Sequence, residues 1–226
     1  HNGDGQGDVT TYIFDGYNRG IQVIDAVGNQ VKTQYDPASN VVEREYFGPL
    51  GGPSRNSSST AGNVLLARTT SFYDELSRVF RQDAQLFLSP GVTTARPVVL
   101  NDGDALPGDG QVTTFTDYDR NSRTTFVTAA SPVGALEVYQ TIYDGASRAV
   151  RIVDPHNNEA VSEFDKNSNP TRIIRIDRNP AARIPQETFV TMSVWDSLNR
   201  LVRTTDNLGQ TRRMTYDSRN LVIRTT

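Results

Sequence analysis

The sequence predicts an all-β fold, an antiparallel meander of short hairpins that repeats as a single array over residues 1–226. Three observations predict it. An aromatic residue followed by Asp recurs eight times, turn signals alternate every 10 or 11 residues, and the composition is rich in Thr (24), Asp (19), Gly (17) and Asn (16). Thr favours strands, whereas Asp, Asn and Gly favour turns. With 7 Glu and 2 Lys, the chain lacks the composition of a helical array.

The aromatic–Asp motif sets the period. Three of its seven intervals are 21 residues, and the longer ones, of 25 to 45 residues, fit the same unit with insertions. The eight pairs are Phe14 and Asp15, Tyr35 and Asp36, Tyr73 and Asp74, Tyr118 and Asp119, Tyr143 and Asp144, Phe164 and Asp165, Trp195 and Asp196, and Tyr216 and Asp217. A fixed period indicates a repeat architecture, in which each unit packs against its neighbours.

Each motif predicts the end of one strand, a turn and the start of the next strand. The ring ends the incoming strand, and we expect the rings of successive repeats to form a ladder of ring contacts. The Asp accepts hydrogen bonds from backbone N–H groups one or two residues on, and Asn or Gly later in the turn tolerates left-handed backbone angles.

The residue five after the aromatic begins the outgoing strand. It is one of Arg19, Asn40, Arg78, Arg123, Arg148, Asn169 and Arg200. We expect these arginines to pair with an Asp of a neighbouring repeat. In the last copy Asn220 follows Tyr216 by four residues, which we interpret as the deletion of one residue.

A second turn signal lies halfway through the 21-residue units, at Asp25–Asn29, Asp154–Asn158 and Asp206–Gln210. The intervening strands are then five to seven residues long, as in 201–205. Their mixture of apolar residues with Thr and Arg predicts one packed face and one solvated face. Residues 47–63 and 88–111 are rich in Gly and Pro and are predicted to be loop insertions, with a shorter one at 179–185.

These residues resemble the RHS or YD repeats of bacterial surface and toxin proteins, which are related to those of the teneurins. The segment WDSLNRLVRTTDNLGQTRRMTYDSRNLV at 195–222 carries the resemblance most clearly. The resemblance implies a sheet that winds as a spiral, either open or closed into a shell or tube, and a location outside the bacterial cell or on its surface. Some shells of the family enclose a toxin.

The ends of the chain are in phase with the repeat. If two copies were laid head to tail, Tyr216 would precede the next Phe14 by 24 residues, within the observed spacing. The chain begins at His1 rather than Met, so we expect a segment of a longer chain or a processed product. Its partners are then further repeats or other copies of itself, paired through open sheet edges.

Several classes of function are excluded by composition. The net charge is −3 and the Arg residues form no basic stripe, which argues against a nucleic-acid partner. The sequence has no Cys, which excludes a disulfide scaffold, a thiolate metal site and a Cys nucleophile. It also has no apolar run of about 18 residues that would predict a membrane span.

The motif carboxylates recur in every repeat, whereas a catalytic pair should be unique, so we predict no enzymatic activity and no cofactor. His156 is interpreted as a turn residue. Asp102, Asp104 and Asp109 are candidate calcium ligands, although solvated turns explain them better.

The sequence therefore predicts a structural scaffold that forms a filament, tube or shell wall. Two alternatives remain open. One is a fragment of a shell that encapsulates and delivers a toxin. The other is a cell-surface adhesin that binds carbohydrate by stacking sugars on its aromatic rings.

Overall fold

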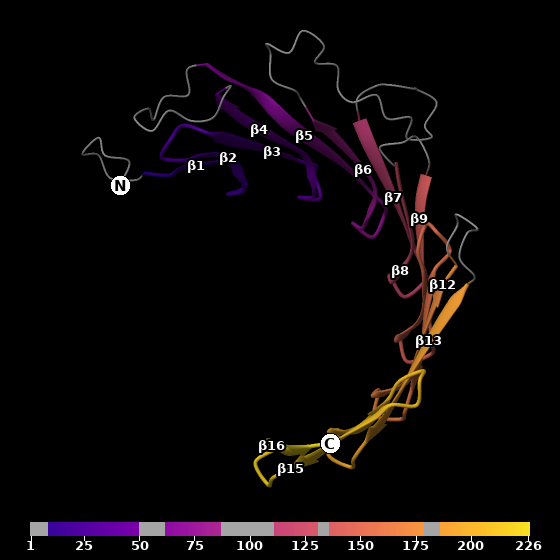
Figure 1. The fold of residues 1–226 in the computed structure, drawn as a ribbon. Helices are drawn as coiled ribbons and strands as arrows, with labels where there is room; N and C mark the ends of the chain where they lie inside the picture. The colour runs from indigo at the N-terminus through magenta and orange to yellow at the C-terminus, as the bar shows by residue number, and fades with distance from the viewer. Residues whose placement is uncertain (1–8, 50–61, 87–110, 131–135, 179–185) are drawn as a thin grey trace. The chain divides into compact units, whose positions relative to one another are not determined.

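A computed structural model describes residues 9–49, 62–86, 111–130, 136–178 and 186–226. Its regular structure is entirely β, with strands that pair antiparallel in the order of the chain (Figure 1). The predicted all-β meander is confirmed. The strands are β1 (Thr11–Phe14), β2 (Gly20–Ile24), β3 (Gln30–Tyr35), β4 (Val41–Pro49), β5 (Asn63–Tyr73), β6 (Val79–Leu86), β7 (Gln111–Tyr118), β8 (Thr124–Ala130), β9 (Leu136–Tyr143), β10 (Ala149–Val153), β11 (Glu159–Phe164), β12 (Pro170–Asp177), β13 (Glu187–Trp195), β14 (Leu201–Thr205), β15 (Thr211–Tyr216) and β16 (Val222–Thr225).

The chain divides into two compact units, which are described separately. The first comprises residues 1–117 with 128–136, and the second comprises 118–127 with 137–226. The first unit contains the consecutive antiparallel pairs from β1 to β7, and the second contains those from β9 to β16. No helix capable of crossing a membrane occurs among the described residues.

The two ends of the strands carry different connections. All eight aromatic–Asp motifs join an odd-numbered strand to the next even-numbered one, so in each unit these turns lie on one side of the sheet. The opposite side carries the turns at 25–29, 154–158 and 206–210, and it is where the even-numbered strands end. We call the first the motif side and the second the return side.

The two longer predicted insertions are shorter than the sequence indicates, because residues at their ends belong to strands. Most of 47–63 and of 88–111 lies outside the described residues, as does all of 179–185. Phe47, Gly48 and Pro49 nevertheless belong to β4, where Gly48 and Pro49 pair with the start of β5, and Gln111 begins β7. Gly and Pro are tolerated in β4 because they lie at its very end, where few ladder bonds are lost.

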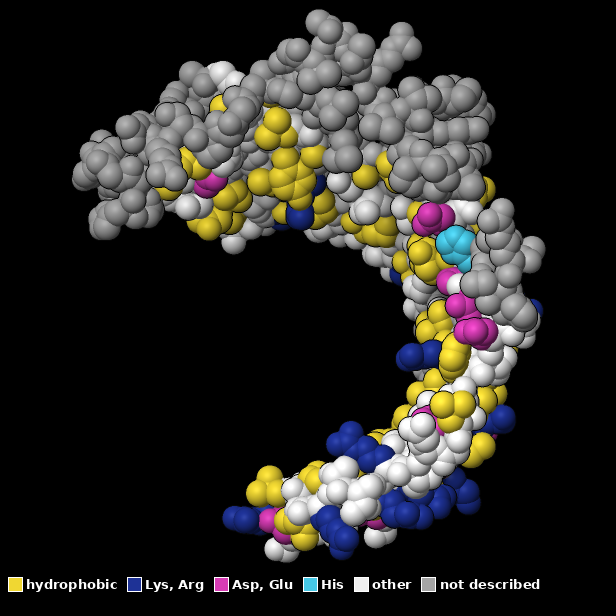
Figure 2. Space-filling model, in the orientation of Figure 1, with side chains coloured by type: hydrophobic (Ala, Val, Ile, Leu, Met, Phe, Trp, Pro, Cys, Tyr) yellow, Lys and Arg dark blue, Asp and Glu magenta, His cyan; other side chains and the backbone are white. Residues whose placement is uncertain are grey.

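Burial is shallow on both faces of the strands. Each described strand pairs only with its neighbours in the chain, and Thr113 is the largest described side chain that is fully buried. All five residues of β2 are half-buried, which differs from the predicted division into a packed and a solvated face. Figure 2 shows hydrophobic side chains at the surface over the strands of each unit. Side chains in these sheets are covered mainly by cross-strand neighbours, so contacts along the sheet must supply most of the stability.

Candidate functional site

The eight motif turns share one backbone geometry. In each, the N–H of the first residue, Asp, donates to the carbonyl of the fifth residue at 2.9–3.0 Å, and the N–H of the fourth donates to the Asp carbonyl at 3.0–3.2 Å. The turns are Asp15–Arg19, Asp36–Asn40, Asp74–Arg78, Asp119–Arg123, Asp144–Arg148, Asp165–Asn169, Asp196–Arg200 and Asp217–Leu221. The return turns at 25–29, 154–158 and 206–210 make the same two bonds. The two turn signals of the sequence therefore encode one structure, a three-residue hairpin loop.

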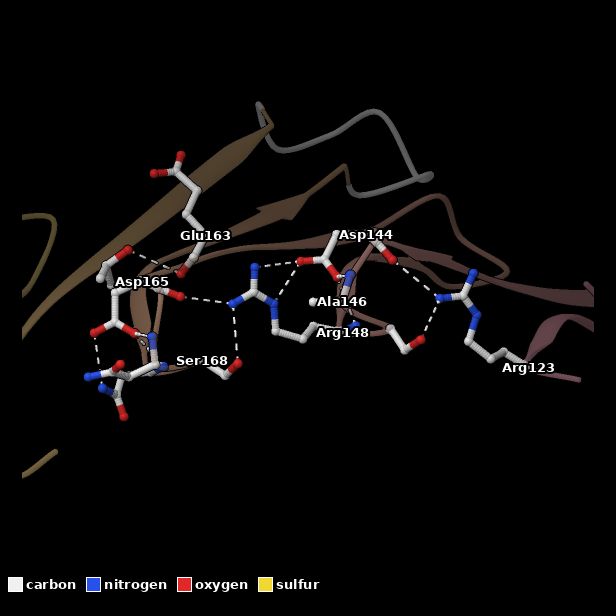
Figure 3. A network of polar contacts seen from close by, with 11 residues as sticks. Arg123, Asp144, Ala146, Arg148, Glu163, Asp165 and Ser168 are labelled. Carbon is white, nitrogen blue, oxygen red and sulfur yellow. Dashed lines mark hydrogen bonds and ion pairs between the residues drawn. The ribbon is translucent and has the colours of Figure 1, made fainter. Parts of the chain in front are cut away.

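The Asp side chain organises each turn. The Oδ1 atom of Asp144 accepts the N–H groups of Ala146 at 2.9 Å and Arg148 at 3.0 Å, and its Oδ2 atom accepts Arg148 Nε at 2.7 Å (Figure 3). A carboxylate that accepts three such bonds is stabilised in its charged form. Hydrogen bonds from the fifth residue accordingly hold the pKa of all eight motif aspartates below the ordinary value of 3.8.

The motif arginines pair with the Asp of their own turn. Arg148 lies 2.7 Å from Asp144, and Arg19, Arg78, Arg123 and Arg200 make the equivalent contact. The expectation that they pair with the Asp side chain of a neighbouring repeat is wrong. The first and fifth residues of a hairpin loop stand opposite each other, so the carboxylate of the same turn is the nearest acceptor.

The arginine also reaches the next motif turn. Nη1 of Arg148 donates to the carbonyl of Asp165 at 2.9 Å and to Oγ of Ser168 at 3.3 Å (Figure 3). We call this reaching side chain the turn arm. Arg19, Arg123 and Arg200 make the same two contacts with the first and fourth residues of the following turn. The arms of Asn40 and Asn169 contact only the fourth residue, Ser77 and Asn199 respectively.

The turn arms also cover the motif rings. The guanidinium of Arg148 lies 4.7 Å from the ring centroid of Phe164, a cation–π geometry. Three further arginines cover the next motif ring at 4.6–4.8 Å. In place of the predicted ladder of ring contacts, these motifs alternate a ring with a guanidinium. Tyr216 is tied further, because its hydroxyl donates to the carbonyl of Leu201 at 2.8 Å.

The fourth turn residue is the one that sequence reasoning missed. It has a left-handed φ in every motif turn, between 58° and 69°, and it is Ser in five of them. From the sequence, Asn or Gly is expected at the left-handed position of the turn, because these residues tolerate that conformation. The structure supplies a reason for Ser, since in the turns with a described arm contact its hydroxyl accepts the arm. The recurrent Ser directly before Arg or Asn was the available signal.

The last motif turn contains no deletion. Asn220 occupies the fourth position with a φ of 65°, and Leu221 occupies the fifth, where its N–H donates to Asp217 at 2.9 Å. The earlier interpretation is therefore wrong. The turn has its full length, and a Leu replaces the Arg or Asn found at the fifth position of the other motif turns.

The contribution of the fourth residue can be measured at Ser147, whose hydroxyl accepts Arg123 Nη1 at 3.1 Å. Ser147→Ala keeps the backbone strain and loses this acceptor, so we expect the free energy of unfolding to fall by about 1 kcal/mol. Ser147→Gly loses the acceptor but removes the strain, so it should stay within about 0.5 kcal/mol of the parent. Urea unfolding of both variants tests this, and an alanine variant as stable as the parent would contradict it.

The remaining candidate residues are His156 and the three predicted calcium ligands. His156 is the third residue of a return turn, where its N–H donates to Asp154 at 2.9 Å. The calcium candidates Asp102, Asp104 and Asp109 lie outside the described residues. Within the described ranges, no group of three His, Cys, Asp or Glu could hold a metal.

One groove in the second unit is lined by both apolar and polar side chains. It has a volume of about 430 Å³ near the return side and is lined by apolar Ile152 and Phe189 and by polar Asn158 and Arg175, among others. The Phe189 side chain is 44% exposed. Glu159, at the margin of this groove, forms ion pairs with Arg151 and Arg178. Hydrogen bonds from these two arginines, and first of all from Arg151, lower the pKa of the Glu159 carboxyl.

This chain is similar to known proteins, in sequence over its last residues and in fold over most of its length. Residues 195–226 match the family model of the RHS repeat. A complex of TcdB2, TccC3 and Cdc42 is similar in fold, with a TM-score of 0.65 and 14% identity over 95% of this chain. The Tc holotoxin pore of Photorhabdus luminescens has a TM-score of 0.63 and 15% identity over 95% of this chain. This chain spans 10% of the length of each of those chains. A search of curated protein sequences gave no match.

Proposed function

Because residues 195–226 are an RHS repeat and the other motif turns repeat its contacts, we propose that this chain is a non-enzymatic wall segment of an RHS-type shell. The observation that carries the proposal is the line of turn arms, which joins successive hairpins in each unit. Such contacts hold a single layer of strands together without a second layer to pack on. A scaffold needs that property, and a catalytic site does not.

The carboxylates support a structural role. A general acid or base must be free to exchange a proton with a substrate. The carboxylates of Asp144 and Asp196 are instead occupied by backbone N–H groups and by an arginine of the same turn. We propose that the shell encloses a protein cargo outside the bacterial cell or on its surface, since the fold is also found in toxin complexes. A filament of the same wall is the alternative assembly.

Electron microscopy of the native polypeptide that contains residues 1–226 tests this proposal. We expect hollow particles whose wall is one strand layer thick. Filaments would contradict the proposed shell but still fit a single-layer wall segment. Solid globular particles would contradict both proposals. Tryptic digestion before and after detergent opening gives a second readout, because an enclosed cargo should become cleavable only after opening.

Carbohydrate binding is a second candidate function, favoured by the groove at Phe189. An exposed ring beside amide and guanidinium groups is a surface on which a sugar ring can stack and form hydrogen bonds. Glycan-array binding that is lost in Phe189→Ala would support it. The matched control is Phe115→Ala, another partly exposed ring on a strand, at 37%. If both variants bind glycans equally well, the groove at Phe189 is not the carbohydrate site.

A further inference from the structure

The groove at Phe189 lies over a row of residues that stand opposite one another on four adjacent strands. The row consists of Ile152 in β10, Ala160 in β11, Arg175 in β12 and Phe189 in β13. Residues opposite each other in an antiparallel pair lie on the same face of the sheet. Ala160 has the smallest side chain of the row and stands between two long ones. The hollow of about 430 Å³ therefore has Ala160 as its floor.

The two ends of the row are apolar and only partly covered. Ile152 is 45% exposed and Phe189 is 44% exposed. An apolar side chain seated over Ala160 would remove part of both from water, which is favourable. The groove is therefore suited to an apolar group of about the size of a side chain.

Most of the polar side chains of the groove are already occupied. The carboxylate of Asp154 accepts the backbone N–H of Asn158 at 2.8 Å and its side-chain amide at 2.8 Å. The carbonyl oxygen of that amide accepts the N–H of Arg178 at 2.9 Å. Glu159 forms ion pairs with Arg151 and Arg178. These groups hold one another in place, so they have little left to offer a ligand.

Arg175 differs from these groups. Its side chain is exposed and has no hydrogen bond or ion pair to a described residue. The adjoining residues 179–185 contain no Asp or Glu that could pair with it. Asp177 and Glu187 stand opposite each other at the return-side end of the same strands, where they repel another carboxylate. The groove thus presents one unpaired guanidinium, a group that only donates hydrogen bonds.

We propose that this groove binds a segment of a partner protein in which Asp or Glu is next to an apolar residue. The carboxylate pairs with Arg175 through two parallel hydrogen bonds, and the apolar side chain lies over Ala160 between Ile152 and Phe189. A carboxylate only accepts hydrogen bonds, so it matches this donor better than a sugar hydroxyl, which also donates. The inference concerns one groove, goes beyond the role of a wall and does not depend on it.

The charge requirement is tested by titrating the 226-residue chain with the peptide acetyl-Leu-Glu-Phe-amide in a calorimeter. The peptide should bind at least about tenfold more tightly than its counterpart with Gln in place of Glu. Arg175→Gln should abolish this preference. Arg212→Gln is the matched control, because Arg212 is an exposed arginine on the same face and has no side-chain partner among the described residues. It should keep the preference.

The shape requirement is tested at the floor of the groove. Ala160→Leu fills the hollow and leaves Arg175 in place, so it should weaken binding of the Glu peptide at least about tenfold. Ala160→Ser keeps the floor small and should bind as the parent does. Circular dichroism melts confirm that each variant is folded.

Four results would each overturn the proposal. They are equal binding of the Glu and Gln peptides by the parent, equal preference in Arg175→Gln and Arg212→Gln, parent-like binding by Ala160→Leu, and displacement of the peptide by the neutral sugar maltotriose. The last result would assign the groove to carbohydrate. Shell imaging is independent of these titrations, so either proposal can fail alone.

Discussion

Arg148→Ala is expected to lower the free energy of unfolding by about 3 kcal/mol. The side chain is 26% exposed and makes four contacts at once. It pairs with Asp144, donates to the Asp165 carbonyl and the Ser168 hydroxyl, and covers the Phe164 ring. Its loss would separate two motif turns that are joined in the parent. Urea unfolding gives the magnitude, and hydrogen exchange in β9 to β12 shows whether the loss is local.

Two variants separate this effect from a loss of charge. Arg120→Ala removes an exposed arginine from the second position of a neighbouring motif turn, and it should change stability by less than about 0.5 kcal/mol. Arg148→Lys keeps the charge but not the planar fork, so it should recover only part of the loss. Equal destabilisation by Arg120→Ala and Arg148→Ala would contradict the role of the turn arm.

Acid should destabilise this protein. Hydrogen bonds from the fifth turn residue lower the pKa of eight aspartates in the folded state, and the ordinary value is 3.8. Below that ordinary value the unfolded chain binds more protons than the folded one. Stability is therefore complete above about pH 5 and falls as the pH drops through the folded pKa values. We expect Tm to fall as the pH is lowered from about pH 5 to pH 2.5.

Salt distinguishes hydrogen bonds from long-range attraction as the cause. At the motif aspartates, hydrogen bonds lower the pKa the most, and coulombic attraction to arginine lowers it the least. The acid transition should therefore persist in about 0.5 M NaCl, which screens charges beyond a few ångströms. A transition that disappears in salt would contradict the assignment. Calorimetric scans at matched pH with and without salt provide the measurement.

The sequence predicts the local part of this structure well. The aromatic–Asp pairs mark strand ends because the turn forms within five residues, and the period follows from the hairpins. The turn arm was not predictable in this way, because it joins residues 17 or more positions apart, such as Arg148 and Asp165. Its reach depends on the lateral distance between hairpins in the sheet. Asn220 was misread for a related reason, since only the backbone shows which turn position it occupies.

The motif side and the return side impose different rules on sequence change. On the motif side, turns of the same unit contact one another through turn arms such as Arg148, so a change in the length of one turn would misplace its contacts with its neighbours. On the return side the connections vary, from five-residue turns such as Asp206–Gln210 to the much longer segment between β6 and β7. A lineage of such chains can therefore acquire, exchange or lose whole peptide inserts at one margin while the opposite margin keeps its spacing. Foreign epitopes or small domains are best grafted there.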